Sequence, residues 1–313
     1  LFSVAKDDRM IFMRGTVLSR EASLSWLDPS GLTIEEIPDK DKFYSVVLSP
    51  DDRFIALTVR DARETNRDLW IYEIERGFPN RFTNDETDEG HPIWTPDGRF
   101  IYYVANPDGG YKVYRKAVSG IRPPELVFDF ETEVRIWDIS PDGELLLYSL
   151  VGEGGNIDLW VTALDGTQDP RALVQTAAVD GAAKFSPDGK WISYWSMETG
   201  TGQVYLAPWP GMEWSRRVST TTGTWQFWLN DSRTLIFQDE DSRVFSSTIE
   251  GEGENVKIGV PVPMFTHGGM TFDGPFIDVT GDGEKFIAVG NSETNPPGHF
   301  EVILNWSELL QAR

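Results

Sequence analysis

The stretch Phe185-Ser186-Pro187-Asp188-Gly189-Lys190-Trp191-Ile192-Ser193-Tyr194 contains a tight turn between two apolar runs. Proline presets the first backbone angle of such a turn, aspartate caps it with its carboxylate, and glycine accepts the positive φ that lets the chain reverse. The residues after the turn are aromatic and β-branched, as in strands. The stretch therefore predicts a β-hairpin.

Turns of the same kind recur along the chain. Seven copies align on the aspartates Asp7, Asp51, Asp97, Asp142, Asp188, Asp231 and Asp282. The steps between them are 44, 46, 45, 46, 43 and 51 residues. Asp8 and Asp52 take the glycine place in the first two turns, and Ser232, the residue least suited to a positive φ, takes it in the sixth. A period of this length is typical of β-propeller blades.

A second pattern completes each repeat. An apolar run ending at a turn glycine follows the hairpin, as in Asp158-Leu159-Trp160-Val161 before Gly166, and a shorter run such as Arg171-Ala172-Leu173-Val174 comes next. Repeats of this kind bury their faces only against neighbouring copies, and closing the ring removes the exposed end faces. The sequence predicts an all-β, seven-bladed β-propeller of four-stranded antiparallel blades, with six blades as the second choice if the weak first or sixth copy is degenerate.

The two ends need a separate interpretation. One propeller domain is expected over residues 1–313, as a fragment of a longer protein, with 307–313 as a short C-terminal tail. Residues 1–5 are expected to form an inner strand with nothing before it, and residues 300–306 a third strand. The last blade then lacks a regular outer strand, and the ring is expected to close without a shared blade. The residues leave open whether an N-terminal strand completes that blade.

Composition limits the class of protein. Hydrophobic residues make up 40% of the chain, with 12 tryptophans and 18 phenylalanines, so a large core can form. No segment is apolar over the roughly 18 residues of a membrane span. The net charge of -22 disfavours nucleic acid, because phosphate binding needs clustered Lys and Arg. Cysteine is absent, which excludes thiol chemistry and fits either the cytoplasm or the cell envelope.

The hairpin unit at residues 185–194, together with third strands such as Asp158-Leu159-Trp160, resembles the TolB-like, WD40-like PD40 repeat family of β-propellers along essentially the whole chain. The element order and the terminal Val302-Ile303-Leu304-Asn305-Trp306 are similar to the propeller of multidomain bacterial proteins, where a kinase or winged-helix domain precedes it. The resemblance implies a binding or sensing role in the bacterial cell envelope or periplasm, or as a cytoplasmic C-terminal module. Some relatives, such as oligogalacturonate lyases, are metal-dependent enzymes.

One face of the ring is the expected place of function. The repeated turns lie on one face, whereas the loops between second and third strands and the connections between blades surround the channel mouth on the other. These connections are acidic: Asp85, Glu86, Asp88, Glu89, Glu131, Glu133, Asp180 and Asp273. They are expected to rim the funnel and to attract a divalent cation or a segment bearing Lys or Arg, although carboxylates on solvated loops usually serve solubility alone.

Aromatic and imidazole side chains also fall on or near this face. The histidines His91, His267 and His299 fall in its segments, and imidazoles favour zinc or manganese. Their expected blades lie almost across the ring from one another, so no shared metal site is predicted and His91 is expected to pack at the start of its inner strand. Most tryptophans near the inner strands are expected to pack between blades; these are Trp94, Trp137, Trp195, Trp225 and Trp228.

Catalytic motifs are absent from the sequence. It has no Gly-x-Ser-x-Gly elbow, phosphate-binding loop or dinucleotide fingerprint. The predicted function is a non-enzymatic sensor or scaffold propeller, a monomer without a required cofactor, that binds a protein segment or small ligand. The alternative is a metal-dependent carbohydrate-active enzyme of the polyuronate lyase or hydrolase type. The predicted binding residues are Asp88, His91, Glu133, Asp180, Trp225, Asp273 and His299.

Overall fold

The computed structural model describes residues 2–4, 9–13, 22–60, 66–120, 122–152, 154–267, 277–291 and 300–304. Within these ranges the regular elements are β-strands, apart from two short 3-10 turns, η1 (Pro107–Gly109) and η2 (Gly253–Asn255). The all-β prediction is therefore confirmed.

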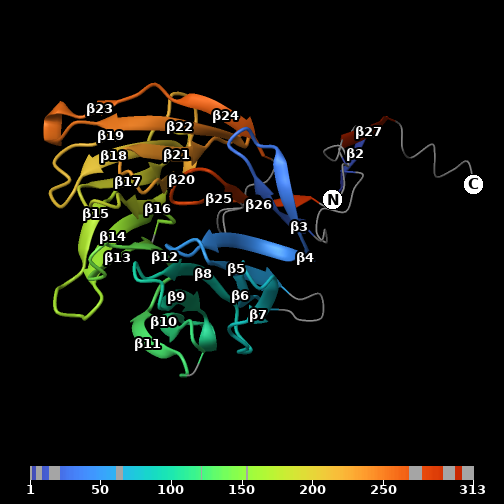
Figure 1. The fold of residues 1–313 in the computed structure, drawn as a ribbon. Helices are drawn as coiled ribbons and strands as arrows, with labels where there is room; N and C mark the ends of the chain where they lie inside the picture. The colour runs from blue at the N-terminus through green and yellow to red at the C-terminus, as the bar shows by residue number, and fades with distance from the viewer. Residues whose placement is uncertain are drawn as a thin grey trace, which may run out of the picture.

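Six four-stranded antiparallel blades form a ring in the described part of the chain (Figure 1). Blade 1 contains residues 42–48 of β4 (Thr33–Leu48), then β5 (Phe54–Arg60), β6 (Asp68–Glu73) and β7 (Phe78–Arg81). Blade 2 contains β8 (Glu89–Trp94), β9 (Phe100–Ala105), β10 (Tyr111–Ala117) and β11 (Glu125–Phe130). Blade 3 contains β12 (Val134–Ile139), β13 (Leu145–Val151), β14 (Ile157–Ala163) and β15 (Arg171–Val174).

The remaining blades follow the same plan. Blade 4 contains β16 (Asp180–Phe185), β17 (Trp191–Ser196), β18 (Gln203–Pro208) and β19 (Arg216–Arg217). Blade 5 contains β20 (Thr224–Trp228), β21 (Thr234–Gln238), β22 (Arg243–Glu250) and β24 (Val262–Thr266), and β23 (Lys257–Ile258) pairs with the end of β22. Blade 6 contains β25 (Ile277–Val279), β26 (Phe286–Asn291), β3 (Ala22–Leu27) and residues 33–41 of β4.

Strands from both ends of the chain close the ring in blade 6. Its two inner strands, β25 and β26, come late in the sequence, and its two outer strands, β3 and the first part of β4, come early. Strand β4 then continues as the inner strand of blade 1. The expected closure without a shared blade is therefore wrong, because β3 pairs with β26 along its whole length.

The expectation of seven blades is also wrong, and the second choice of six is right. Strands β1 (Phe2–Val4), β2 (Arg9–Met13) and β27 (Phe300–Leu304) form a separate three-stranded sheet in the order β1-β2-β27. Figure 1 shows this sheet beside the ring. The first repeat does form a hairpin, but the strand that would extend it, β3, is taken by blade 6. Asp7 and residues 305–313 lie outside the described residues.

The core is divided among the junctions between neighbouring blades. The described residues form six clusters of buried side chains, and each joins two adjacent blades. At the junction of blades 1 and 2, for example, Leu69 packs with Trp94 and Tyr103. This arrangement is what a repeat protein requires, since each sheet covers its apolar faces only with its neighbours.

The repeated turns have the predicted chemistry. In the turn of blade 4, the Ser186 hydroxyl donates to Oδ1 of Asp188 at 2.7 Å and Gly189 has a φ of +67°. The place of that glycine is taken by Asp52 in blade 1 and by Ser232 in blade 5, with φ of 54° and 56°. The aspartates therefore shape hairpins, and the opposite face carries the irregular loops.

Candidate functional site

Three inner strands contain a bulge in which a residue with a side chain adopts a left-handed backbone. These residues are His91 of β8, Ala182 of β16 and Trp225 of β20, with φ of 52°, 47° and 38°. They occupy equivalent places, and each strand shifts its pairing register there. Bulges of this kind re-aim a side chain and are enriched next to functional sites, and a positive φ is unfavourable for a bulky residue. The inner strands are therefore bent where they line the channel.

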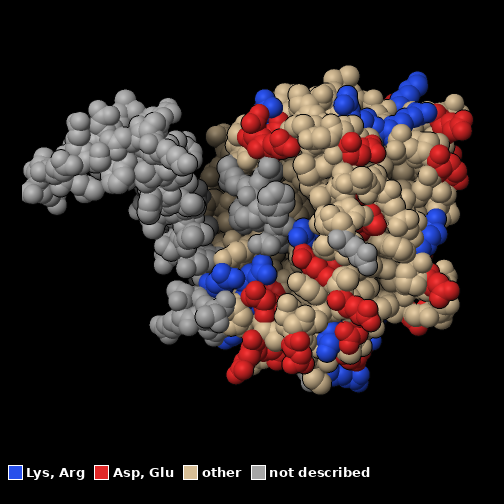
Figure 2. All heavy atoms as spheres, turned by 180° about the vertical axis from the view of Figure 1, so that it is seen from behind, with Lys and Arg blue, Asp and Glu red and all other residues tan. Residues whose placement is uncertain are grey.

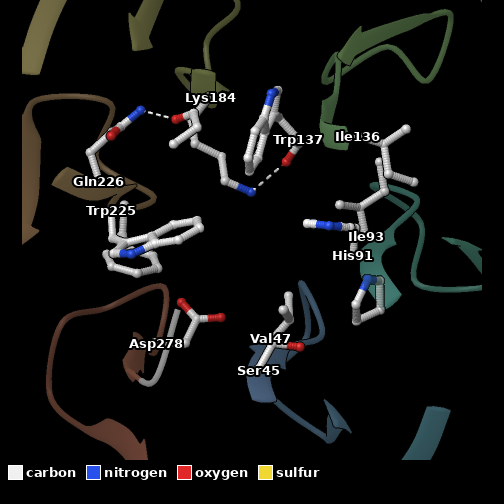
Figure 3. Close-up of a pocket in the computed structure, with 13 residues that line it drawn as sticks. Ser45, Val47, His91, Ile93, Ile136, Trp137, Lys184, Trp225, Gln226 and Asp278 are labelled. Atoms are coloured by element: carbon white, nitrogen blue, oxygen red, sulfur yellow. Dashed lines mark hydrogen bonds between the residues drawn. The ribbon is translucent and has the colours of Figure 1, made fainter. Parts of the chain in front are cut away.

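Side chains from all six inner strands line a cavity of about 80 Å³ in the central channel (Figure 3). Lys184 enters it from blade 4, where its Nζ donates to the carbonyl of Trp137 at 2.8 Å and lies 3.8 Å from Oδ1 of Asp138. Asp278 enters from blade 6, and burial raises its pKa to about 6. Gln226 donates to the carbonyl of Ala182 in the neighbouring blade. The channel is narrow, and its polar groups mainly join one blade to the next.

A larger pocket of about 290 Å³ opens where blades 3, 4 and 5 meet. We call it the mouth pocket, and the residues that line it are Arg135, Trp137, Ile157, Val179, Asp180, Gly181, Ala182, Trp195, Met197, Thr224, Trp225 and Glu240. Trp137, Ala182 and Trp225 also line the channel cavity, so the two spaces adjoin. The pocket lies at the end of the ring opposite the aspartate turns, where loops and blade connections meet.

Three tryptophans from consecutive blades form the aromatic walls of the mouth pocket. The rings of Trp137 and Trp225 lie 6.1 Å apart between centroids, at an interplanar angle of 62°. Trp137 is held firmly, because its Nε1 donates to the Ser149 hydroxyl at 2.6 Å and that hydroxyl donates to the carbonyl of Asp180 at 3.0 Å. The pocket therefore presents two indole surfaces that meet at an angle, one of them fixed by a hydrogen-bond chain.

Glycines provide the space that the indoles occupy. A Cβ on Gly181 would lie 3.0 Å from Cζ2 of Trp137, and one on Gly202 would lie 2.4 Å from Nε1 of Trp195. The second distance is shorter than real side-chain contacts allow. Gly202 is therefore required for the observed position of the Trp195 ring.

The polar groups of the mouth pocket are unequally paired. Asp180 is fully buried, and its Oδ2 accepts from the Thr176 hydroxyl at 2.8 Å, whereas its Oδ1 has no hydrogen-bond partner. Burial raises the pKa of Asp180, while the nearby Ser196 and Thr176 hydroxyls oppose that rise without completing a bond to Oδ1. The second carboxylate, Glu240, is exposed.

Among the described residues that line the mouth pocket, the guanidinium of Arg135 is already engaged in an ion pair. Nη2 and Nε of Arg135 both donate to Oε1 of Glu133, at 2.8 and 3.1 Å. Arg135 is therefore paired with Glu133, which lies beside the pocket, and not with Asp180 or Glu240, the two carboxylates that line it.

The structure brings together only some of the predicted binding residues. Asp180 and Trp225 line the mouth pocket, Trp225 and His91 line the channel, and Glu133 lies beside the pocket through its pair with Arg135. The ring of His91 packs edge-on against Trp137 at 5.9 Å. Asp273 and His299 lie outside the described residues. The binding roles of these residues stay predictions.

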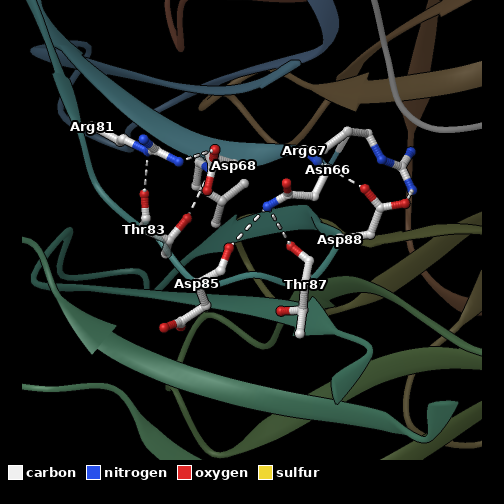
Figure 4. Close-up of polar contacts among 9 residues, drawn as sticks. Asn66, Arg67, Asp68, Arg81, Thr83, Asp85, Thr87 and Asp88 are labelled. Atoms are coloured by element: carbon white, nitrogen blue, oxygen red, sulfur yellow. Dashed lines mark hydrogen bonds and ion pairs between the residues drawn. The ribbon is translucent and has the colours of Figure 1, made fainter. Parts of the chain in front are cut away.

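Asp88 lies away from this group, in the connection between blades 1 and 2 (Figure 4). Its Oδ1 accepts from the backbone N–H of Arg67 at 2.8 Å, and its Oδ2 lies 3.5 Å from the Arg67 guanidinium. Asn66 donates to the carbonyl of Asp85 at 2.9 Å, so this acidic connection is tied to its own loop. Acidic residues here shape the chain rather than form a rim.

The expected carboxylate ring is not continuous. Glu89 is 1% exposed, and burial raises its pKa to about 8. Figure 2 shows acidic and basic side chains interspersed over the face seen from behind Figure 1. Among the residues that the structure describes, no three His, Asp or Glu side chains are grouped so as to hold a metal ion. Nor does any described helix have the length and apolar character needed to cross a membrane.

The two described histidines, His91 and His267, lie in different blades. His267, at the end of blade 5, donates from Nε2 to the carbonyl of Val289 in blade 6 at 3.0 Å. Burial lowers its pKa. His91 belongs to blade 2 and faces the channel. These two imidazoles therefore have different surroundings, and each has a structural contact of its own.

Sequence reasoning missed Trp137, Trp195, Met197 and Glu240 as lining residues, and it assigned both tryptophans to packing between blades. A signal was available, because Trp137, Trp195 and Trp225 belong to three consecutive repeats, and Trp195 and Trp225 lie near the ends of their strands away from the turns. What the pattern did not reveal is that their rings converge on one space.

Sequence comparisons match the chain to parts of longer proteins. No protein-family model matches it. It is 23% identical over 248 residues to tricorn protease homolog 1 of Streptomyces coelicolor, which covers 75% of this chain and 22% of that protein. It is 26% identical over 162 residues to the peptidase YuxL of Bacillus subtilis, which covers 40% of this chain and 24% of that protein. The chain thus matches only a minor part of each of these relatives.

Structural comparisons identify the fold. A TolB of Agrobacterium tumefaciens aligns with a TM-score of 0.65 at 17% identity, over 88% of this chain and 100% of that one. TolB from Acinetobacter baumannii aligns at 0.59 and 15% identity, over 92% and 67%. An oligogalacturonate lyase in complex with manganese aligns at 0.59 and 14% identity, over 96% and 87%. The resemblance to TolB-like β-propellers is confirmed at the level of fold, which by itself assigns no function.

Proposed function

We propose that this chain is a binding propeller that holds a segment of another polypeptide in the mouth pocket. The observation that carries the proposal is the mouth pocket itself, which has three tryptophans around a buried carboxylate with one unpaired oxygen. Its volume of about 290 Å³ is near the lower limit of ordinary ligand pockets, which begin at roughly 300 Å³. It is large enough for one side chain or a small ligand.

The chemistry of the lining residues supports binding. The described residues that line the mouth pocket include no serine, cysteine, histidine or lysine, and aromatic and aliphatic side chains make up most of the rest. Fixed aromatic rings instead offer large apolar surfaces at little conformational cost, and they dominate the energetics of many interfaces. The mouth pocket is thus suited to recognition of a protruding group.

A polypeptide is the favoured ligand for two reasons. Both sequence relatives are peptidases by name, and polypeptides are what peptidases act on. The chain also has the propeller fold of the TolB structures, and loops at a channel mouth can receive a segment from one side of the ring.

A peptide selection tests this proposal. A library of random linear peptides displayed on phage is selected against the wild-type chain, and the enriched peptides are synthesised and titrated. We expect them to lose affinity for Gly202→Ala, because its Cβ would collide with the Trp195 ring at 2.4 Å. Gly110→Ala is the matched control, since a Cβ there meets only the carbonyl of Pro107 at 4.0 Å. Peptides that bind both variants equally would place the binding surface elsewhere and overturn the proposal.

The alternative function, a metal-dependent lyase or hydrolase of anionic sugars, rests on fold likeness to the manganese-bound oligogalacturonate lyase. The described residues supply no cluster of three candidate ligands that would favour it. Titration of the chain with Mn²⁺ followed by calorimetry tests it directly. A stoichiometric site abolished by His91→Ala would support the alternative, and heats no larger than those of dilution would count against it.

A further inference from the structure

We propose that the group received by the mouth pocket is a lysine side chain, with its alkyl stem against the tryptophans and its ammonium at Asp180 and Glu240. This inference rests on the proposed function, since it names the chemistry of the group that the partner segment presents.

The aromatic walls suit a cation with an apolar stem. A cation over an aromatic face is attracted by the ring quadrupole, and tryptophan is the best of the aromatic residues for this purpose. Trp137 and Trp225 pack edge-on at 62° to each other, so a group in the angle that the two rings form can contact both. Ile157, Val179 and Met197 add apolar lining that would cover methylene groups.

The charges around the mouth pocket favour a cation. Asp180 is fully buried and its Oδ1 has no donor, and a buried polar atom without a partner is destabilising. Glu240 lines the same space, and the charge of Glu198 acts on Asp180 from nearby. The guanidinium of Arg135, which lines the pocket, is already held by Glu133 at 2.8 Å. A positively charged group would therefore satisfy the pocket, whereas an anion would meet several carboxylates.

The hydrogen-bond state of Asp180 favours an ammonium over a guanidinium. Oδ2 already accepts from the hydroxyl and, at 3.3 Å, from the backbone N–H of Thr176, so only Oδ1 is open. A guanidinium achieves its full strength through two parallel bonds to one carboxylate. An ammonium acts as a compact point charge and needs only one free oxygen.

Indole ¹H–¹⁵N NMR of the tryptophan-labelled chain tests the inference, with the signals assigned by single Trp→Phe variants. The probes are the N-acetyl methylamides of lysine, norleucine, arginine and glutamate. Norleucine keeps the stem of lysine without its charge. We expect the lysine probe to shift the signals of Trp137 and Trp225 at concentrations about tenfold lower than norleucine requires, a factor that corresponds to about one hydrogen bond to a charged group.

Carboxylate variants supply the second readout. Asp180→Asn and Glu240→Gln should each weaken the lysine probe several-fold and leave norleucine unchanged. Asp180 is buried, so its variant can fail to fold. Glu240 is exposed, so Glu240→Gln should fold normally and tests the inference by itself. Asp165→Asn, a carboxyl removed from the exposed turn after β14, is the control and should change neither probe.

The outcomes separate the two proposals. Equal binding of norleucine and lysine, or tighter binding of arginine or glutamate, would overturn the lysine inference and leave the binding function standing. The same holds if selected peptides occupy the mouth pocket without any lysine. Peptides that never engage the pocket would overturn the proposed function, and the lysine inference with it.

Discussion

Asp278 of β25 accepts a hydrogen bond from the backbone N–H of Leu48 in β4 at 2.7 Å, although 230 residues separate them. This bond joins the inner strands of blades 6 and 1, where the ring closes. The same device occurs inside the chain, where Asp138 of β12 accepts from the backbone N–H of Phe185 in β16 at 2.9 Å. A side-chain acceptor on one inner strand thus anchors the next, and at Asp278 it links the two ends of the propeller.

The closure bond predicts different effects for two substitutions. Asp278→Ala leaves the Leu48 N–H without its acceptor and should lower the free energy of unfolding by about 1 to 3 kcal/mol. Asp278→Asn keeps an acceptor oxygen and removes a carboxylate whose pKa burial raises to about 6, so its stability at pH 7 should equal or exceed that of the wild type. Urea unfolding of both variants measures this. Equal losses would show that the charge, not the acceptor, matters at the closure.

Glu89 predicts a fall in stability as pH rises. Burial raises its folded-state pKa to about 8, above the ordinary value of 4.5. The folded chain therefore retains a proton that the unfolded chain has lost, so this group's stabilising contribution is complete below pH 4.5 and declines up to about pH 8. Glu89→Gln should raise the melting temperature at pH 8 and change it little at pH 4. A melting temperature that responds equally at both pH values would contradict this.

The left-handed backbone of Trp225 predicts that substitutions there change stability and peptide binding independently. Its φ of 38° is unfavourable for any residue with a Cβ, whereas glycine tolerates it. Trp225→Gly and Trp225→Ala both remove the indole from the mouth pocket, so both should lose the selected peptides. The glycine variant should nevertheless be more stable than the alanine variant by about 1 kcal/mol. Chemical denaturation of the pair, with peptide titration on each, tests both statements; an alanine variant as stable as the glycine variant would refute the strain.

Replacement of Ser232 by glycine is expected to stabilise the chain. Ser232 adopts a φ of 56° where most other blades have glycine. Ser232→Gly should stabilise the chain by about 0.5 to 1 kcal/mol, because it relieves the left-handed conformation at an exposed turn. Gly143→Ala is the reverse change in blade 3, where φ is +79° and a Cβ would meet nothing within 4 Å, so its cost is conformational alone. Thermal unfolding should move in opposite directions for the two.

The hairpins could be predicted from local chemistry alone. The Ser-Pro-Asp-Gly turn encodes its own backbone angles, and in the structure Ser186, Asp188 and Gly189 make the contacts that these residue types imply. The number of blades could not be predicted in the same way. The copy of the turn at Asp7 is weak in sequence, yet strands β1 and β2 on either side of it still pair as a hairpin, and this hairpin is left outside the ring because β3 pairs with β26.

The site shows the same division. Asp180 was predicted to bind because it belongs to an acidic connection on the face away from the turns, and Trp225 was predicted both to bind and to pack between blades. Trp137 and Trp195 were predicted only to pack, since packing between blades usually explains a tryptophan on an inner or second strand. The left-handed bulge at Trp225 and the small residues Gly181 and Gly202 turn the three rings toward one space.

By itself, the sequence determined the repeat, the four-stranded unit and the face on which irregular loops gather, because each depends on residues close together in the chain. Only the tertiary structure decided that six blades close the ring and that three tryptophans and a partly unpaired Asp180 share one pocket. These depend on pairings between strands and between blades that lie far apart in the chain. Several strands compete for such a pairing, and the result depends on contacts between residues far apart in the chain, so no local sequence pattern predicts it.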